Sequence, residues 1–193
     1  MYIDSLLSDK GPLCVGITAV RNEHELDGEQ LIAIGVSQSK EVLAVQLFNA
    51  SKIVDVHHLL AASQNALNAW RGDYAKSRSL DVEIAVYASG QRQIGRALES
   101  IGVSNNLTDI GAVIIAEREE NVLSCLEALV REIGAELEDP FPADRDRLEM
   151  IMKYFEIEPR ELNSFVTSGD TRDLQNALSR CVASRVSMVA LDT

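Results

Sequence analysis

The residues of this chain whose types and spacing suggest chemistry are cations and amides on both sides of one short apolar run. Lys76 and Arg78 precede the run, and Arg92, Gln93 and Arg96 follow it. Guanidinium, ammonium and amide groups donate hydrogen bonds to phosphate oxygens, to sugars and to base edges. The pattern therefore predicts a site that holds an anionic ligand.

The apolar run between these groups predicts the element that positions them. Aliphatic residues occupy alternate positions, with acids and an alanine between them: Leu80, Val82, Ile84 and Val86 alternate with Asp81, Glu83 and Ala85. A period of two is typical of a strand with one buried face, so we expect a strand over residues 80–88. Ala88-Ser-Gly then ends the pattern ahead of a predicted helix. Such a connection would gather the cations of both flanks over one patch.

The charge of the chain limits which ligand that patch can hold. The net charge is −12 over 193 residues, which argues against binding along a long nucleic acid duplex. Residues 71–96 differ from the rest, because their five cations and three acids give +2 while the remaining residues carry −14. A small basic island on an acidic body is expected to hold a short anionic ligand.

Other residues that could carry chemistry do not form recognisable sites. His57 and His58 are adjacent in a predicted helix, so their side chains point about 100° apart and we expect no metal site. The sequence has no G-x-S-x-G nucleophile motif. The cysteines Cys14, Cys125 and Cys181 are far apart, which is consistent with a reducing compartment. We therefore expect no metal, no cofactor and no catalytic residue.

The segment Gly90-Gln-Arg-Gln-Ile-Gly95 leaves an alternative open. It joins the predicted strand to a predicted helix but lacks the GK[ST] ending of a nucleotide-hydrolysing loop. Free backbone N–H groups at the helix start, together with Arg92, could still bind an anion. An enzyme or binding module for a small anionic ligand at the Ser89–Arg96 turn is therefore the alternative function. A structural scaffold with a solvated basic loop is a third hypothesis.

The pattern along the chain predicts one α+β domain over residues 1–193, with a helical C-terminal part at 143–185. We expect a mixed sheet of about four strands covered by helices, with strands at 13–20, 42–48, 80–88 and 110–116. Helices are expected at 56–70, 94–101, 119–133, 148–155 and 174–182, and residues 23–40 fit either a helix or a strand. No segment reaches the roughly 20 apolar residues of a membrane span. The N-terminus lacks a signal-peptide pattern, so we expect a cytoplasmic protein with no membrane partner.

Three segments of the chain resemble a known family. Ala75-Lys-Ser-Arg-Ser-Leu-Asp-Val-Glu83, Val86-Tyr-Ala-Ser-Gly-Gln-Arg-Gln-Ile94 and Ala97-Leu-Glu-Ser-Ile-Gly-Val103 are similar to the archaeal kinase-binding subunit of the KEOPS complex, the CGI-121 family. The resemblance covers most of the chain from about residue 42 onward. It implies a non-catalytic accessory subunit that binds a small atypical kinase/ATPase and the single-stranded 3′ CCA end of tRNA. The complex makes the threonylcarbamoyl modification of the adenosine beside the anticodon.

Given this resemblance, the chemistry of the residues singled out above suggests a role for each. Lys76 and Arg78 would neutralise phosphates, and Arg92, Gln93 and Arg96 would contact phosphate, ribose or base edges. Ile94 would supply apolar contact, and Tyr87 either the same contact or part of the core. The kinase would meet the apolar stripe Leu174, Leu178 and Val182 on the C-terminal helix. The alternative for that stripe is that it closes the domain.

Overall fold

A computed structural model describes residues 1–191 of the chain and shows an α+β fold built on one antiparallel sheet. The sheet order is β1-β2-β4-β3, and each neighbouring pair is antiparallel. The strands are β1 (Tyr2–Leu6), β2 (Leu13–Arg21), β3 (Ala44–Asn49) and β4 (Asp109–Ala116). The predicted α+β class is confirmed, with antiparallel pairings throughout in place of the mixed sheet that we expected.

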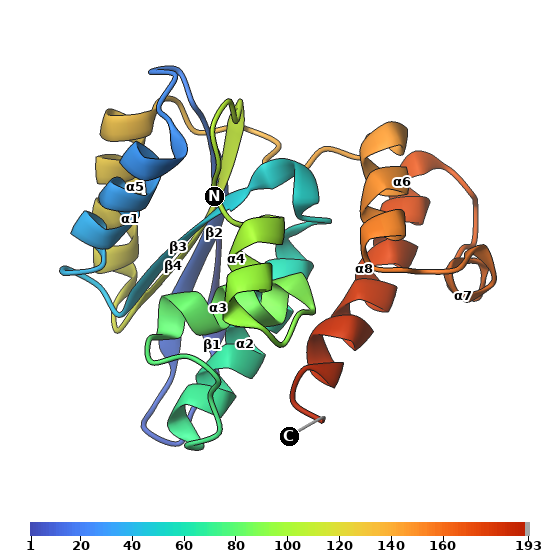
Figure 1. Ribbon diagram of the computed structural model, residues 1–193, viewed down its shortest axis with the longest axis horizontal. Coiled ribbons are helices and arrows are strands. Elements are labelled where there is room, and N and C mark those ends of the chain that lie inside the picture. Colours follow the sequence, from blue (N-terminus) through green and yellow to red (C-terminus); the bar gives the residue numbers. More distant parts are fainter. Residues whose placement is uncertain (192–193) are drawn as a thin grey trace.

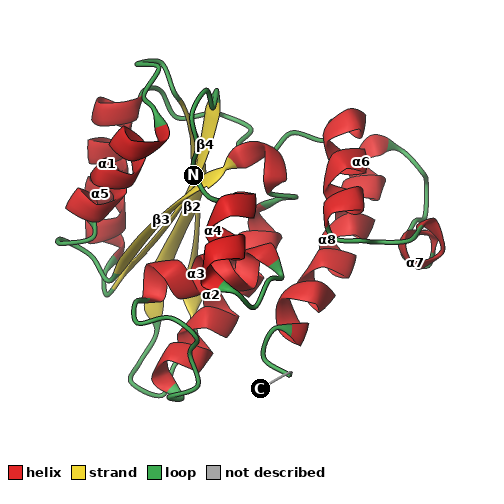
Figure 2. Ribbon diagram, viewed as in Figure 1, coloured by secondary structure: helices red, strands yellow, loops and turns green. Residues whose placement is uncertain are grey.

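Helices cover both faces of this sheet (Figures 1 and 2). The helices α1 (Gly28–Gln38) and α5 (Glu119–Ile133) lie on one face. On the other face are α2 (Val56–Arg71), α3 (Leu80–Ser89) and α4 (Ile94–Ile101), and a short 3-10 turn, η1 (Ala50–Lys52), precedes α2. The last third is helical as expected: α6 (Arg145–Tyr154), α7 (Pro159–Asn163) and α8 (Thr171–Met188), with α8 packed on α2.

The two inner strands divide the core between these helix layers. Along β4, Val113 and Ile115 pack into the cluster under α2 and α3, whereas Ile110 and Ile114 pack into the cluster under α1 and α5. Successive strand side chains point to opposite faces of a sheet, so one continuous apolar run can fill both layers. This explains why residues 110–116 are hydrophobic without alternation.

Capping residues set the helix boundaries where the sequence predicted them. Asp55 caps α2 through the N–H of His58, and Asp170 caps α8 through the N–H of Asp173. Gly134 follows the last residue of α5. The ambiguous segment 23–40 contains a helix, α1, which starts in a capping box formed by Asp27 and Gln30.

The predicted strand at 80–88 is wrong, because these residues form the helix α3. Every residue from Glu83 to Ser89 is buried, so the segment packs on all sides and has no solvent face to mark a helical period. Asp81 and Glu83 in the first turn favour the helix, and Gly90 ends it with φ 66°. The alternation of Leu80, Val82, Ile84 and Val86 therefore marks no strand face, since the intervening Glu83 and Ala85 are buried as well.

Candidate nucleic-acid interface

The turn between α3 and α4 is held in place from below by two side chains from distant parts of the chain. His58 Nε2 lies 2.8 Å from the carbonyl of Ala88, and the Tyr154 hydroxyl lies 3.1 Å from the carbonyl of Ser89. These two carbonyls belong to the last turn of α3, where helix carbonyls lack helical partners. The Ser89 hydroxyl accepts the N–H of Gln91 at 3.0 Å. These contacts hold the end of α3 and the first residues of the turn, up to Gln91.

The N-terminus of α4 at this turn is open to an anion. Gln93 occupies the cap position and forms no side-chain cap, and the first turn of the helix contains no acid. Arg92, Gln93 and Arg96 are exposed around it, and a Cβ on Gly95 would meet nothing within 4 Å. Uncapped N–H groups and the helix dipole favour a negative charge at this end. The arrangement can bind a phosphate.

The apolar residues predicted for the site divide between the core and the surface. Ile94 is half-buried and packs against the main core at the start of α4. Tyr87 is 1% exposed and belongs to that core, so it has no surface on which an RNA base could rest. Burial, with Tyr74 and Glu83 nearby, raises the pKa of Tyr87 to about 12. Ile94 alone of the two can contact a ligand.

The loop before α3 carries the other predicted cations at the opposite end of this helix. Lys76 is half-buried and Arg78 is exposed. The buried carboxylate of Glu83 accepts the backbone N–H groups of Lys76 and Ser77 at 3.1 and 2.7 Å. A helix of this length spans about 15 Å, so Lys76 and Arg78 lie at a distance from Arg92 and do not form one compact pocket with it. The two groups are separate cationic positions.

Several residues near these positions were not predicted from the sequence as part of the site. The Lys52 ammonium lies 6.0 Å from the centre of the Tyr154 ring, which itself contacts the turn. Trp70 and Tyr74, at the end of α2 and in the loop before α3, are 42% and 45% exposed. Exposed aromatic rings can stack on unpaired bases. For Trp70 and Tyr74, their position in the sequence close to Lys76 was a signal that could have placed them at the site. Lys52 and Tyr154 are distant in sequence, and no local pattern could have placed them there.

The apolar stripe predicted to meet a partner lies largely inside the protein. Leu178 and Val182 are 1% and 0% exposed and pack into the main core, and Leu174 is half-buried against it. The burial supports the alternative that this stripe closes the domain. Outward-facing positions of α8 are mostly polar, and Met188 near its end is 48% exposed.

Within residues 1–191, no cluster of three or more histidine, cysteine or acidic residues could hold a metal ion. Cys14, Cys125 and Cys181 are free thiols, and burial raises the pKa of Cys125 to about 11. Among the described helices, none combines the length and the apolar character needed to cross a bilayer.

A four-stranded antiparallel sheet covered by helices on both faces, with a cation-flanked turn between α3 and α4, defines a small α+β protein. Residues 17–190 match the family model described as "Kinase binding protein CGI-121". The chain belongs to this family, which confirms the resemblance found in its sequence. A curated relative, the EKC/KEOPS complex subunit TPRKB of Danio rerio, is 26% identical over 146 residues, or 72% of this chain and 83% of the relative.

Proposed function

We propose that the protein is a non-catalytic accessory subunit of a KEOPS-type complex that modifies tRNA. In this role it binds a small atypical kinase/ATPase and holds the single-stranded 3′ CCA end of tRNA at the turn between α3 and α4. Family membership and the name of the relative support the kinase-binding and complex-forming part of the proposal. The geometry of the turn supports the RNA-binding part.

The observation that carries the RNA-binding part is the uncapped N-terminus of α4. It contains no acid in its first turn and is flanked by Arg92 and Arg96, in a chain whose net charge is −12. A single-stranded end offers few phosphates, so a small cationic site is enough to bind it. Gln93 can donate to a base edge or ribose, and Ile94 offers an apolar edge. Lys76 and Arg78, at the other end of α3, would contact a more distant part of the RNA strand.

The test is a titration of tRNA with and without its CCA end, at two salt concentrations. We expect binding to require the CCA end and to weaken at the higher salt, because each phosphate contact releases counterions. Equal binding of both tRNA forms would reject recognition of the CCA end. Tight binding of inorganic phosphate with no preference for tRNA would favour the alternative of a small anionic ligand at Ser89–Arg96.

Paired variants locate the RNA contact. Reversing the charges in Arg92→Glu with Arg96→Glu should abolish binding of the CCA end and leave kinase association unchanged. The matched control is Arg118→Glu, since the Arg118 side chain is 72% exposed just before α5, on the other side of the sheet. Co-elution with the kinase in size-exclusion chromatography gives the second measurement. Loss of both activities in the double variant would contradict separate surfaces.

We place the kinase contact on the helical C-terminal part, through Leu174 and the exposed end of α8 near Met188. Leu178 and Val182 would support this surface from inside, since both are buried. A Met188→Asp change should weaken co-elution with the kinase while tRNA binding stays unchanged.

A further inference from the structure

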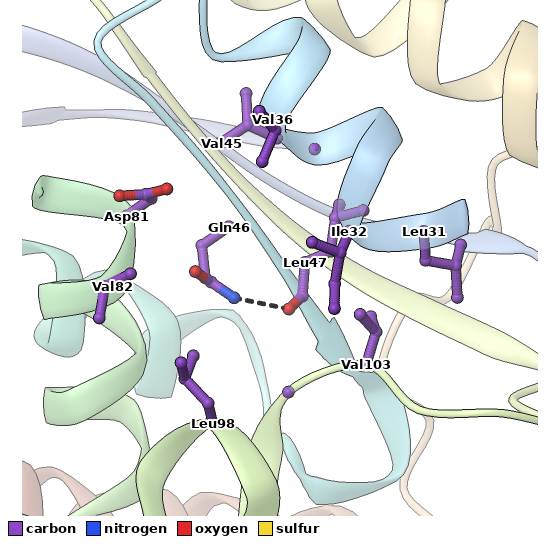
Figure 3. A pocket seen from close by; sticks show the side chains of 12 residues that line it. Leu31, Ile32, Val36, Val45, Gln46, Leu47, Asp81, Val82, Leu98 and Val103 are labelled. Carbon is purple, nitrogen blue, oxygen red and sulfur yellow. Dashed lines mark hydrogen bonds between the residues drawn. The ribbon is translucent and has the colours of Figure 1, made fainter. Parts of the chain in front are cut away.

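A groove on the side of the molecule away from the C-terminal helices has no role in the proposed function. It has a volume of about 250 Å³ and lies between α1 on one side and α3 and α4 on the other, with β3 as its floor (Figure 3). Its walls are mainly aliphatic. Ile32 and Val36 of α1 are 55% and 58% exposed, and Leu98 of α4 is 37% exposed.

The floor of the groove is the free edge of the sheet. In the order β1-β2-β4-β3, β3 pairs with β4 on one side and has no strand beyond it among the described residues. The carbonyl of Leu47 faces the groove, where the Gln46 side-chain amide donates to it at 2.8 Å (Figure 3). A side chain thus occupies an acceptor that a further strand could use.

The chain itself shows that this edge pairs with extended backbone. Phe48 forms an isolated antiparallel bridge with Gly102, which has extended φ and ψ values of −70° and 179°. A Cβ at position 102 would clash with the carbonyl oxygen of Leu98, so only glycine fits there without a shift. One end of the edge is therefore already paired, whereas Val45, Gln46 and Leu47 line the groove.

We propose that the groove binds an extended aliphatic segment of a partner protein, which adds to β3 as a further antiparallel strand. Its apolar side chains would lie between Ile32 and Val36 on one wall and Val82 and Leu98 on the other. Strand addition of this kind combines backbone hydrogen bonds with side-chain pockets. Asp81 is the charged residue among the described groove-lining residues, so the segment carries a lysine or arginine beside it. The edge of a second copy would not fit, because helices flank β3 on both sides (Figure 3).

The test uses a ten-residue fluorescent peptide with lysine at each end and valine and threonine in alternating pairs between them, so that valines face both walls of the groove. We expect saturable binding by fluorescence anisotropy, with amide shift changes at residues 44–49 in NMR spectra. The same peptide N-methylated at alternate backbone nitrogens should bind at least about tenfold more weakly, because it cannot donate to the strand edge. Absence of saturable binding, or equal binding of the N-methylated peptide, would overturn the proposal.

Variants of the groove wall complete the test. Ile32→Glu with Val36→Glu should weaken peptide binding by about tenfold or more, because charges would line an apolar contact. Met150→Glu is the control, since Met150 on α6 is also 55% exposed and lies outside the groove. Asp81→Lys should weaken binding of the lysine-ended peptide and strengthen binding of a peptide that ends in glutamate. If the Ile32→Glu/Val36→Glu double variant and the Asp81→Lys variant both bind the peptide as tightly as the unchanged protein does, the groove is not the binding site of the peptide.

Discussion

The backbone N–H of Ser77 donates a 2.7 Å hydrogen bond to Oε2 of Glu83, a carboxylate that is 0% exposed. Its second oxygen accepts the N–H of Lys76 at 3.1 Å. This buried acid thus satisfies its oxygens with the backbone of an outer loop. Through Glu83, the core helix α3 positions the loop that carries Lys76 and Arg78.

Replacing this acid by its amide tests that coupling. Glu83→Gln puts an N–H2 group where one backbone donor now points, so we expect a loss of about 1–3 kcal/mol in the free energy of unfolding. Urea denaturation followed by circular dichroism measures it. The control is Glu99→Gln, an exposed residue of α4, which should change stability by less than about 0.5 kcal/mol. Equal stability of both variants would contradict a structural role for Glu83.

The buried His58 should make the stability depend on pH. Its Nδ1 accepts the N–H of Val54 at 3.3 Å, so Nε2 carries the proton and donates to Ala88. Burial lowers the pKa of His58 from 6.5 to about 4. The unfolded chain therefore binds more protons than the folded chain between these values, and stability rises with pH across this window. The contribution of His58 to the free energy of unfolding is fully present above pH 6.5 and falls by up to about 3 kcal/mol as the pH approaches 4.

The neighbouring histidine supplies a matched control for this pH dependence. His58→Gln should remove the His58 contribution to the slope of unfolding free energy against pH between about 6.5 and 4, at some cost in stability. His57→Gln is the matched control, because it makes the same change at the neighbouring position, where the side chain is 69% exposed. Chemical denaturation at several pH values distinguishes them. An identical slope in both variants would show that another group titrates.

The sequence predicted helices that have both an exposed face and a capped start, with the exception of α1, which was left open between helix and strand. The strand β1 was not predicted. Helix α2 follows from its apolar stripe and from Asp55, and α8 follows in the same way from Asp170. The helix α3 could not be found by periodicity, since a helix buried on nearly all sides loses its 3.6-residue signal. Trp70 closes the apolar spacing of α2, yet it is 42% exposed because the helix ends one residue later.

For the candidate site, the sequence predicted which residues lie at the start of α4 better than it predicted how the turn is supported. Arg92, Gln93 and Arg96 surround the start of α4 as expected, because their positions follow from local sequence. The support beneath the turn comes from His58 and Tyr154, whose contacts with residues 88 and 89 span 30 and 65 positions of sequence. Contacts of that range depend on tertiary packing and leave no local pattern.

Substitution of Leu178 on α8 distinguishes a role in the core from a direct contact with a partner. Leu178 is 1% exposed, so Leu178→Ala should lower the unfolding free energy by about 2–5 kcal/mol through the cavity that it leaves. Met188→Ala, at a site that is 48% exposed, should change it by no more than about 0.5 kcal/mol. Thermal or urea unfolding gives both values. Kinase affinity per folded molecule should fall for Met188→Ala and stay unchanged for Leu178→Ala, and the reverse result would place Leu178 in the interface.

The salt dependence of RNA binding counts the phosphate contacts at the α3–α4 turn. For a single strand, the slope of log K against log salt changes by about 0.7 for each phosphate contact. Arg92→Gln and Arg96→Gln remove charge without adding an acid, so each should make the slope shallower by about that amount if its guanidinium contacts a phosphate. Arg78→Gln should do the same only with RNA long enough to reach the far end of α3, about 15 Å away. Filter binding of a CCA-ended stem and of full tRNA, each at several salt concentrations, gives these slopes. An unchanged slope in Arg92→Gln and Arg96→Gln would mean that these arginines contact bases or no RNA at all, and the uncapped helix start would then be the remaining phosphate contact at the turn.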